Sequence, residues 1–191
     1  FPFTIGYGMT ECGPLISYSS WKQHKLSGVG KPIDQIEVKI DSDDPAHKTG
    51  EILVKGPNVM EGYYKNEQET NRVFTGDGWM HTGDLGLMDK NGYVYIKGRS
   101  KSMILGPSGQ NIYPEEIESQ LNSFHYVMES LVIDRDNKLV AKVYPDYDLA
   151  KDREIDTKDI ERILNRYKNT MNRHLPAYSQ LTKVEIHDEE F

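Results

Sequence analysis

Apolar and polar residues alternate over several short segments in the first half of the chain, a pattern typical of β-strands. The clearest segments are residues 36–40, 51–55 and 93–97. Before the third segment, Asn91 and Gly92 supply the positive φ angles of a tight hairpin turn. Gly98 is expected to end that strand. Residues 1–97 are therefore predicted to form a strand-rich unit folded as a small β-barrel or curled sheet.

The pattern changes after residue 101, where longer segments with helical spacing alternate with strands. The predicted order is helix 114–124, strand 127–133, turn 134–137, strand 138–144, helix 157–174 and strand 182–187. The apolar residues of the long helix fall on one face, which should pack on the sheet. They are Ile160, Ile163, Leu164, Tyr167, Met171 and Leu175. Residues 102–191 are therefore expected to form a small α+β domain with helices packed on a short sheet.

Residues 98–101 join the two regions and carry two cations, Arg99 and Lys101. The segment Gly106–Gly109 consists of turn residues without a helical or strand period, so it is expected to be an exposed loop. A helix then begins at Pro114, because proline suits the first helical position and the glutamates that follow favour the positive helix N-terminus. Taken alone, the residue pattern of this region is as compatible with an ordinary interdomain linker as with a hinge.

Length and charge narrow the class of protein. With 191 residues the chain can form one good core or two small ones, and two are expected. The net charge of −7 argues against nucleic acid or an anionic membrane surface as the principal partner. No apolar run approaches the roughly 20 residues that span a bilayer. The single cysteine, Cys12, cannot form an internal disulfide, which fits a reducing cytoplasm.

Two short segments bring together side chains that could carry chemistry, although neither is specific by itself. The segment Tyr7–Glu11 places an aromatic ring, a hydroxyl and a carboxylate in close succession, and Asp84 follows a Thr-Gly pair. Each also has a structural interpretation. Tyr7 fits a core ring, Thr10 and Glu11 fit helix caps, and Asp84 fits a turn former.

The segment between these two is interpreted as structural. Gly50–Tyr64 contains a strand, a Gly-Pro turn and paired tyrosines, which should help build the barrel. Trp79 and His81 are expected to pack or to line a wall, without a catalytic role.

Three motifs resemble, in the same order, those of the adenylate-forming superfamily, which includes acyl-CoA synthetases, peptide-synthetase adenylation domains and luciferases. They are Tyr7–Glu11, Thr82–Asp84 and the stretch Gly98–Glu118. The resemblance covers essentially the whole chain. Details such as Gly56–Met60 and Leu175–Tyr178 look most like bacterial long-chain fatty-acid CoA ligases.

The resemblance implies a role for five residues of the first half. Tyr7 would stack on adenine, and Thr10 would meet the α-phosphate. Glu11 would help hold Mg²⁺, so that Thr10 and Glu11 are the catalytic candidates. Asp84 and Arg99 occupy the positions that contact the ribose in the family.

The resemblance also implies a division of labour between two domains. Residues 1–97 would be the C-terminal part of the large adenylate-binding domain, 98–101 the hinge and 102–191 the small C-terminal domain. Lys101 is the matching hinge position, where peptide-synthetase domains usually have aspartate. Gly106 or Gly109 would line the CoA tunnel.

The implied reaction converts a fatty acid and ATP to acyl-AMP and pyrophosphate, and then transfers the acyl group to CoA. Its partners would be these small molecules and Mg²⁺, in the cytoplasm, without nucleic acid or a membrane span; the lipid substrate leaves room for peripheral membrane contact. Two alternatives stay open: delivery to a carrier protein instead of CoA, and a truncated, non-catalytic adenylate-binding module. The family's phosphate loop and terminal lysine fall outside residues 1–191, so the chain is expected to be a C-terminal portion that is inactive alone.

Overall fold

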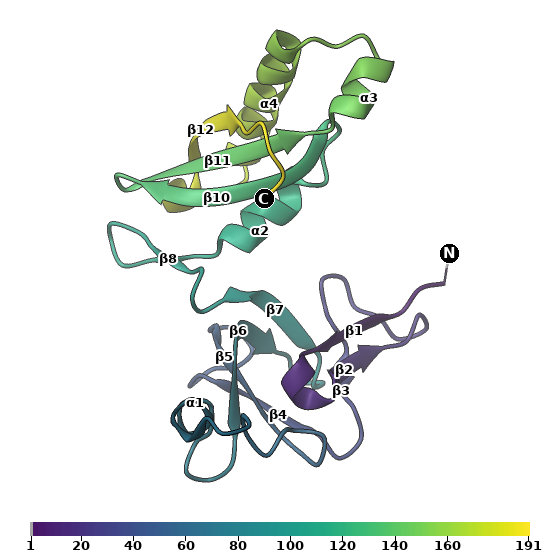
Figure 1. Ribbon diagram of the computed structural model, residues 1–191, viewed down its shortest axis with the longest axis vertical. Coiled ribbons are helices and arrows are strands. Elements are labelled where there is room, and N and C mark those ends of the chain that lie inside the picture. The colour runs from purple at the N-terminus through teal and green to yellow at the C-terminus, as the bar shows by residue number, and fades with distance from the viewer. Residues whose placement is uncertain (1) are drawn as a thin grey trace. The chain divides into compact units, whose positions relative to one another are not determined.

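The computed structural model describes residues 2–191, which divide into two compact units after Lys101 (Figure 1). Each unit has its own buried hydrophobic core. The α+β class and the strand-rich character of the first region are confirmed. None of the helices that the structure describes is long and apolar enough to cross a membrane.

The first unit contains two antiparallel sheets. The three-stranded sheet has the order β1 (Ile5–Gly8), β2 (Leu15–Ser19), β3 (Lys31–Pro32). The four-stranded sheet has the order β4 (Glu37–Asp41), β5 (Gly50–Lys55), β6 (Met80–Met88), β7 (Val94–Arg99). The short helices η1 (Thr10–Cys12) and α1 (Glu67–Val73) lie in the connections after β1 and β5.

The sheets of the first unit do not close into a barrel within the described residues. At β7, Val94 accepts a hydrogen bond from the Val29 amide and donates one to the Gly30 carbonyl, which ties the four-stranded sheet to the segment before β3. The strand β4 stays at the opposite edge. The expected barrel-like unit is therefore a pair of open sheets around one core.

The strand β7 runs further than its sequence predicts. The glycine at position 98 was expected to stop it, but Gly98 pairs with Leu85 and the next residue, Arg99, pairs with Asp84. Continued pairing with β6 keeps the chain extended, and this long-range contact outweighs the weak strand propensity of glycine.

The second unit is built on one three-stranded sheet of order β10 (Val127–Arg135), β11 (Lys138–Pro145), β12 (Leu181–Ile186). The first two strands are antiparallel and the last two parallel. The helices α2 (Pro114–Leu121) and α4 (Thr157–Asn172) pack on β10 and β12 (Figure 1). The smaller elements are β8 (Ile104–Leu105), β9 (Asn111–Ile112), α3 (Tyr147–Asp152) and η2 (Ala177–Ser179).

The predicted apolar face of α4 is the face that packs. Ile160, Leu164 and Met171 are buried in one core with the sheet and with Leu121 of α2. Beyond the end of α2, the Phe124 ring stacks on Tyr167 with a centroid distance of 4.2 Å. The two helices thus cover the sheet through a shared core.

Candidate functional site

The Asp84 carboxylate is the centre of a polar cluster in the first unit. Its Oδ2 accepts a hydrogen bond of 2.7 Å from the Tyr7 hydroxyl, and its Oδ1 lies 3.0 Å from Arg99 Nε. Asp84 and Arg99 are direct cross-strand partners on β6 and β7. The structure therefore brings together three of the residues expected at a nucleotide site.

Tyr7 reaches this cluster from the core. It is 7% exposed and lies in the same hydrophobic cluster as Cys12 and Ile16. Burial raises the pKa of the Tyr7 phenol well above its ordinary value, so the hydroxyl stays protonated and donates to Asp84. Burial likewise raises the pKa of the Cys12 thiol to about 11, which keeps this cysteine a protonated core residue and not a nucleophile.

The sequence suggested that the Thr82–Asp84 motif forms a turn. In the structure the motif lies instead on a β-bulge inside the strand β6. His81 pairs with Leu53 and Leu85 pairs with Glu51, so three residues of β6 face only Ile52 of β5. Bulges re-aim a side chain at the cost of ladder hydrogen bonds. Here the bulge directs Asp84 toward Tyr7 and Arg99.

Side chains replace the ladder hydrogen bonds that the bulge removes. The buried Thr82 hydroxyl donates to the Ile52 carbonyl at 2.8 Å and accepts from the Asp84 amide at 3.1 Å. The Gly83 amide donates to Glu51 Oε1 at 2.9 Å, and the Gly83 carbonyl accepts from the Ser100 amide at 2.9 Å. These four bonds engage the Gly83 and Asp84 amides and the Ile52 and Gly83 carbonyls, and so give the bulge a defined shape.

Glu51 is in turn held by a histidine. Its Oε2 lies 2.9 Å from His81 Nδ1, and the two side chains are 26% and 34% exposed. From the sequence Glu51 was a strand residue and His81 a wall residue, so neither was connected with Asp84. A sequence signal for this contact exists. The strand that begins with Gly50 and Glu51 pairs with the strand that contains His81–Asp84.

Thr10 and Glu11 lie on η1, close in sequence to Tyr7. Thr10 is exposed, whereas Glu11 is half-buried and its Oε1 accepts a 3.0 Å hydrogen bond from the Tyr63 hydroxyl. The Met60 amide donates to the Glu11 carbonyl, which fixes the same turn. Tyr63 was assigned only a structural role from the sequence, yet it orients the carboxylate that is expected to bind metal.

The chemistry of Glu11 fits a magnesium ion that arrives with phosphates. Among residues 2–191, no group of three or more histidine, cysteine, aspartate or glutamate side chains is placed to hold a metal ion. Mg²⁺ is commonly bound through one or two carboxylates, water and substrate phosphates, so a single carboxylate is a sufficient protein contribution.

The glycine loop of the second unit connects β8 to β9. The Gly106 amide donates to the Gln110 carbonyl and the Gly109 amide to the Gly106 carbonyl. Gly109 has φ +82°, with open space where a side chain would begin, whereas Gly106 is buried. The conformational requirement for glycine therefore falls on Gly109.

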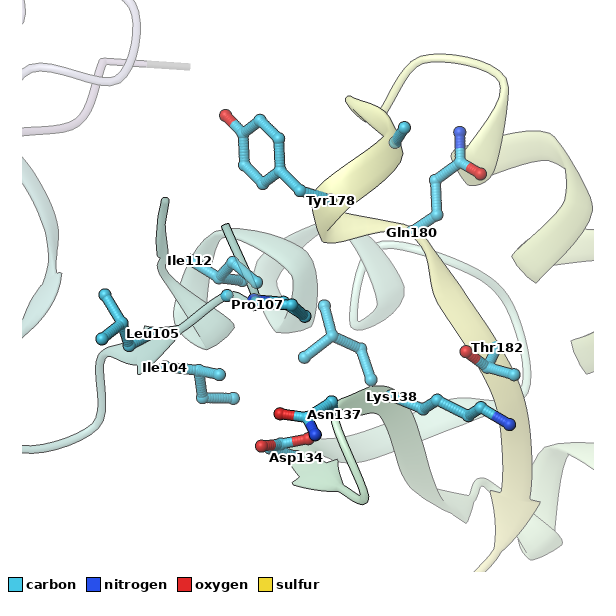
Figure 2. A pocket seen from close by; sticks show the side chains of 13 residues that line it. Ile104, Leu105, Pro107, Ile112, Asp134, Asn137, Lys138, Tyr178, Gln180 and Thr182 are labelled. Carbon is cyan, nitrogen blue, oxygen red and sulfur yellow. The ribbon is translucent and has the colours of Figure 1, made fainter. Parts of the chain in front are cut away.

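A pocket of about 190 Å³ opens beside this loop within the second unit (Figure 2). Leu105 and Pro107 line one side of it, and Lys138 from the start of β11 and Tyr178 from η2 line others. Its walls combine apolar side chains with amide, hydroxyl and charged groups.

Lys101, the predicted hinge residue, is the last residue of the first unit and is exposed in the turn after β7.

Comparisons with known proteins identify the family. The family model described as "AMP-binding enzyme" matches residues 1–64. A 2-succinylbenzoate–CoA ligase of Bacillus subtilis is 40% identical over 148 residues, which are 75% of this chain and 30% of that protein. A long-chain-fatty-acid–CoA ligase of Yersinia pestis is 34% identical over 189 residues, 96% of this chain and 32% of that protein.

A solved structure shares the fold. It is the O-succinylbenzoate coenzyme A synthetase of Bacillus subtilis in complex with ATP and magnesium ion, with a TM-score of 0.81 and 32% identity. The match covers 99% of this chain and 38% of that one. The chain belongs to the adenylate-forming acyl-CoA ligase family. It spans about a third of the length of the two curated ligases.

Membership of this family bears on the residues expected at the nucleotide. Three residues that the sequence placed at the nucleotide are joined by direct hydrogen bonds or an ion pair: Tyr7, Asp84 and Arg99. Thr10 and Glu11 lie on a separate short helix, and Glu11 is hydrogen-bonded to Tyr63. Glu51, His81 and Tyr63 are the residues around these candidate positions that sequence reasoning missed.

Proposed function

We propose that the chain contributes the ribose-binding site and the CoA-side loop of an AMP-forming CoA ligase that activates a fatty acid. In the first half-reaction the carboxylate of the acid attacks the α-phosphorus of ATP, and pyrophosphate leaves. In the second half-reaction the CoA thiol attacks the acyl carbon, and AMP leaves. The observation that carries the proposal is the Asp84 carboxylate, held from two sides by Tyr7 and Arg99.

The geometry of Asp84 suits two neighbouring ribose hydroxyls. Each of its carboxylate oxygens accepts one contact from the protein and keeps acceptor capacity for a second. The side chain is 13% exposed, so its orientation is fixed before a ligand arrives. Prior fixation lowers the entropy cost of binding, since the protein group need not be ordered at that moment.

Thr10 and Glu11 would act at the phosphates. The exposed Thr10 hydroxyl is a neutral donor for an α-phosphate oxygen, and Glu11 would hold Mg²⁺, which neutralises charge on the phosphates when bound. The Tyr63 hydroxyl keeps one Glu11 oxygen engaged and so restricts how the carboxylate turns. Tyr7 serves the site through its hydroxyl, and stacking of its ring on adenine stays a prediction.

The second unit would serve the thioester-forming step. Lys101 is the proposed hinge, and the loop Gly106–Gly109 the proposed contact with CoA. The pocket beside the loop supports this role, because apolar and hydrogen-bonding groups line it together. The pantetheine arm of CoA likewise combines methyl and methylene groups with amides.

The carboxylic acid that the enzyme activates is proposed to be a long-chain fatty acid. The Yersinia pestis relative, which matches 96% of the chain, supports a long-chain fatty acid. The second candidate is 2-succinylbenzoate, supported by the Bacillus subtilis ligase, which is 40% identical over 148 residues. Delivery of the acyl group to a carrier protein stays an alternative to CoA.

Acid-dependent release of pyrophosphate and AMP tests the function in the complete protein that contains this chain. The protein should release both products with ATP, CoA and a long-chain fatty acid, and form acyl-CoA in equal amount. Faster turnover with 2-succinylbenzoate would select the second candidate. No pyrophosphate exchange with any carboxylic acid would reject the enzyme in favour of a binding module.

A further inference from the structure

Glu51 occupies a position from which it can control the direction of the Asp84 side chain. One of its carboxylate oxygens accepts from the Gly83 amide and the other contacts the His81 ring, both at 2.9 Å. We propose that Glu51 is a positioning residue for Asp84, acting through the Gly83 peptide. The inference rests on the proposed ribose contact of Asp84 and adds the group that maintains it.

The contact of Glu51 differs from an ordinary surface ion pair. Exposed ion pairs contribute little because water and salt screen them. Glu51 is only 26% exposed and accepts from a backbone amide that the bulge has separated from the strand ladder. A half-buried amide of this kind needs an acceptor, and a charged acceptor gives the stronger bond.

No neighbouring group among the described residues packs against the side-chain face of Gly83. Its φ is +75°, and no heavy atom lies within 4 Å of the point where a side chain would begin. The structure fixes Gly83 by hydrogen bonds in the two peptide groups that flank it: the Thr82–Gly83 amide donates to Glu51, and the Gly83–Asp84 carbonyl accepts from the Ser100 amide. Glycine in the left-handed region has other conformations within easy reach, so loss of one bond lets the peptide turn.

Rotation of the Gly83 peptide would be transmitted directly to the next residue. Asp84 follows Gly83, and its carboxylate must meet Tyr7 and Arg99 at the same time. Loss of the Glu51 anchor should therefore misdirect the carboxylate without removing it. The binding energy of the ribose hydroxyls should fall, while contacts with the base and phosphates persist.

Two nucleotides isolate this effect: ATP, and 2′,3′-dideoxy-ATP, which lacks both ribose hydroxyls. Their affinities for the complete protein are measured by titration calorimetry, and the ratio of the two Kd values reports the ribose contact. The unchanged protein should prefer ATP. In Glu51→Ala the preference should shrink about tenfold, the effect of losing one charge-assisted hydrogen bond. The Kd for dideoxy-ATP should stay unchanged.

Conservative variants separate positioning from a general loss of structure. Glu51→Gln keeps an oxygen for the Gly83 amide and should retain most of the preference for ATP. His81→Leu leaves the Glu51 carboxylate but removes its support, so it should cause a smaller loss in the same direction; it carries the test if thermal unfolding shows that Glu51→Ala is not folded. Glu37→Ala, an exposed glutamate on β4, is the matched control and should change nothing.

The outcomes distinguish this inference from the function on which it rests. If Asp84→Ala abolishes the preference for ATP but Glu51→Ala and His81→Leu retain it, Glu51 is not a positioning residue. Equal weakening of both nucleotides in Glu51→Ala would likewise reduce Glu51 to a structural role. If the unchanged protein and Asp84→Ala show the same small preference, the ribose role of Asp84 fails and the inference fails with it.

Discussion

At the scale of single residues, the candidate site depends on the contacts that Tyr7 and Arg99 make with the Asp84 carboxylate. Asp84, Tyr7 and Arg99 were recognisable in the sequence from their motifs, whereas the bonds that join Tyr7 to Asp84 and Glu51 to Gly83 were not. Tyr7 lies 77 positions away in the chain, and Glu51 is 32 positions from the Gly83 amide that it binds. Partners at such distances are selected by strand register, which is not encoded by any local pattern.

Replacing Asp84 by alanine should weaken the use of ATP in the complete enzyme. A hydrogen bond to a charged group contributes roughly 1.5–3 kcal/mol, which corresponds to about ten- to a hundredfold in binding or rate. Steady-state kinetics of fatty-acid-dependent pyrophosphate exchange, with ATP varied, measure the effect. A folded variant with unchanged kinetics would return Asp84 to a purely structural role.

Replacing Tyr7 by phenylalanine separates two roles of this ring. The variant keeps the aromatic face and the core packing but removes the hydroxyl that donates to Asp84. If the hydroxyl orients Asp84, the KM for ATP should rise, by less than in Asp84→Ala because Arg99 still holds the other oxygen. If stacking on adenine is the whole contribution, the KM for ATP should not change.

At the scale of elements, periodic segments were predictable and irregular ones were not. The helix α4 and the strands β5, β10 and β11 were found because many residues repeat one pattern. The helices α1 and α3 were missed, since seven and six residues are too few to show a period. Their signal lay in the caps: Asn66 accepts from the Glu69 amide and Asp146 from the Leu149 amide.

The β6–β7 hairpin, which carries both Asp84 and Arg99, is secured by Asp89. Its carboxylate accepts from Lys25 Nζ at 2.5 Å and from the Asn91 and Tyr93 amides, and these contacts lower its pKa to about 2, with Lys25 the main cause. A lowered pKa favours the folded state above the ordinary pKa near 4 and withdraws that stability as the pH falls toward 2.

Acid should therefore destabilise the hairpin through Asp89. The midpoint of thermal unfolding should fall between pH 5 and about 2, and Asp89→Asn should show a smaller fall over the same range because it has no carboxylate to protonate. The variant should be less stable than the unchanged protein near neutral pH. Parallel pH profiles of the two proteins would contradict the assignment.

At the scale of the whole molecule, the described residues form two units, each with its own hydrophobic core, and one short connection joins them. The division after Lys101 follows from two hydrophobic clusters. The length and the change from strand to mixed patterning made two units predictable. The hinge itself stays a prediction that rests on the family resemblance, because local sequence fits a plain linker equally well.

Replacing Lys101 by proline tests the hinge in the complete enzyme. Proline fixes φ near −65° and removes an amide, so the connection should lose most of its rotation while Asp84 and Glu11 stay in place. If the connection settles in the adenylation pose, fatty-acid-dependent pyrophosphate exchange should persist. Conversion of preformed acyl-adenylate to acyl-CoA should then fall sharply.

A matched variant completes the hinge test. Lys101→Ala keeps the rotation of the backbone and should retain both half-reactions. Equal loss of both activities in a well-folded Lys101→Pro protein, or no loss in either, would show that rotation at this residue is not part of the cycle.

The hydrogen bond from the Ser100 amide to the Gly83 carbonyl lies next to the end of the first unit. It ties the chain to the bulge one residue beyond β7, and Lys101 is the first residue after it. A pivot at Lys101 would then begin immediately beside the peptide that aims Asp84. Binding of a nucleotide at Asp84 and rotation at Lys101 would then be coupled through the Gly83–Asp84 peptide group. A ligand that restricts Asp84 would also restrict Ser100, the residue just before the proposed pivot.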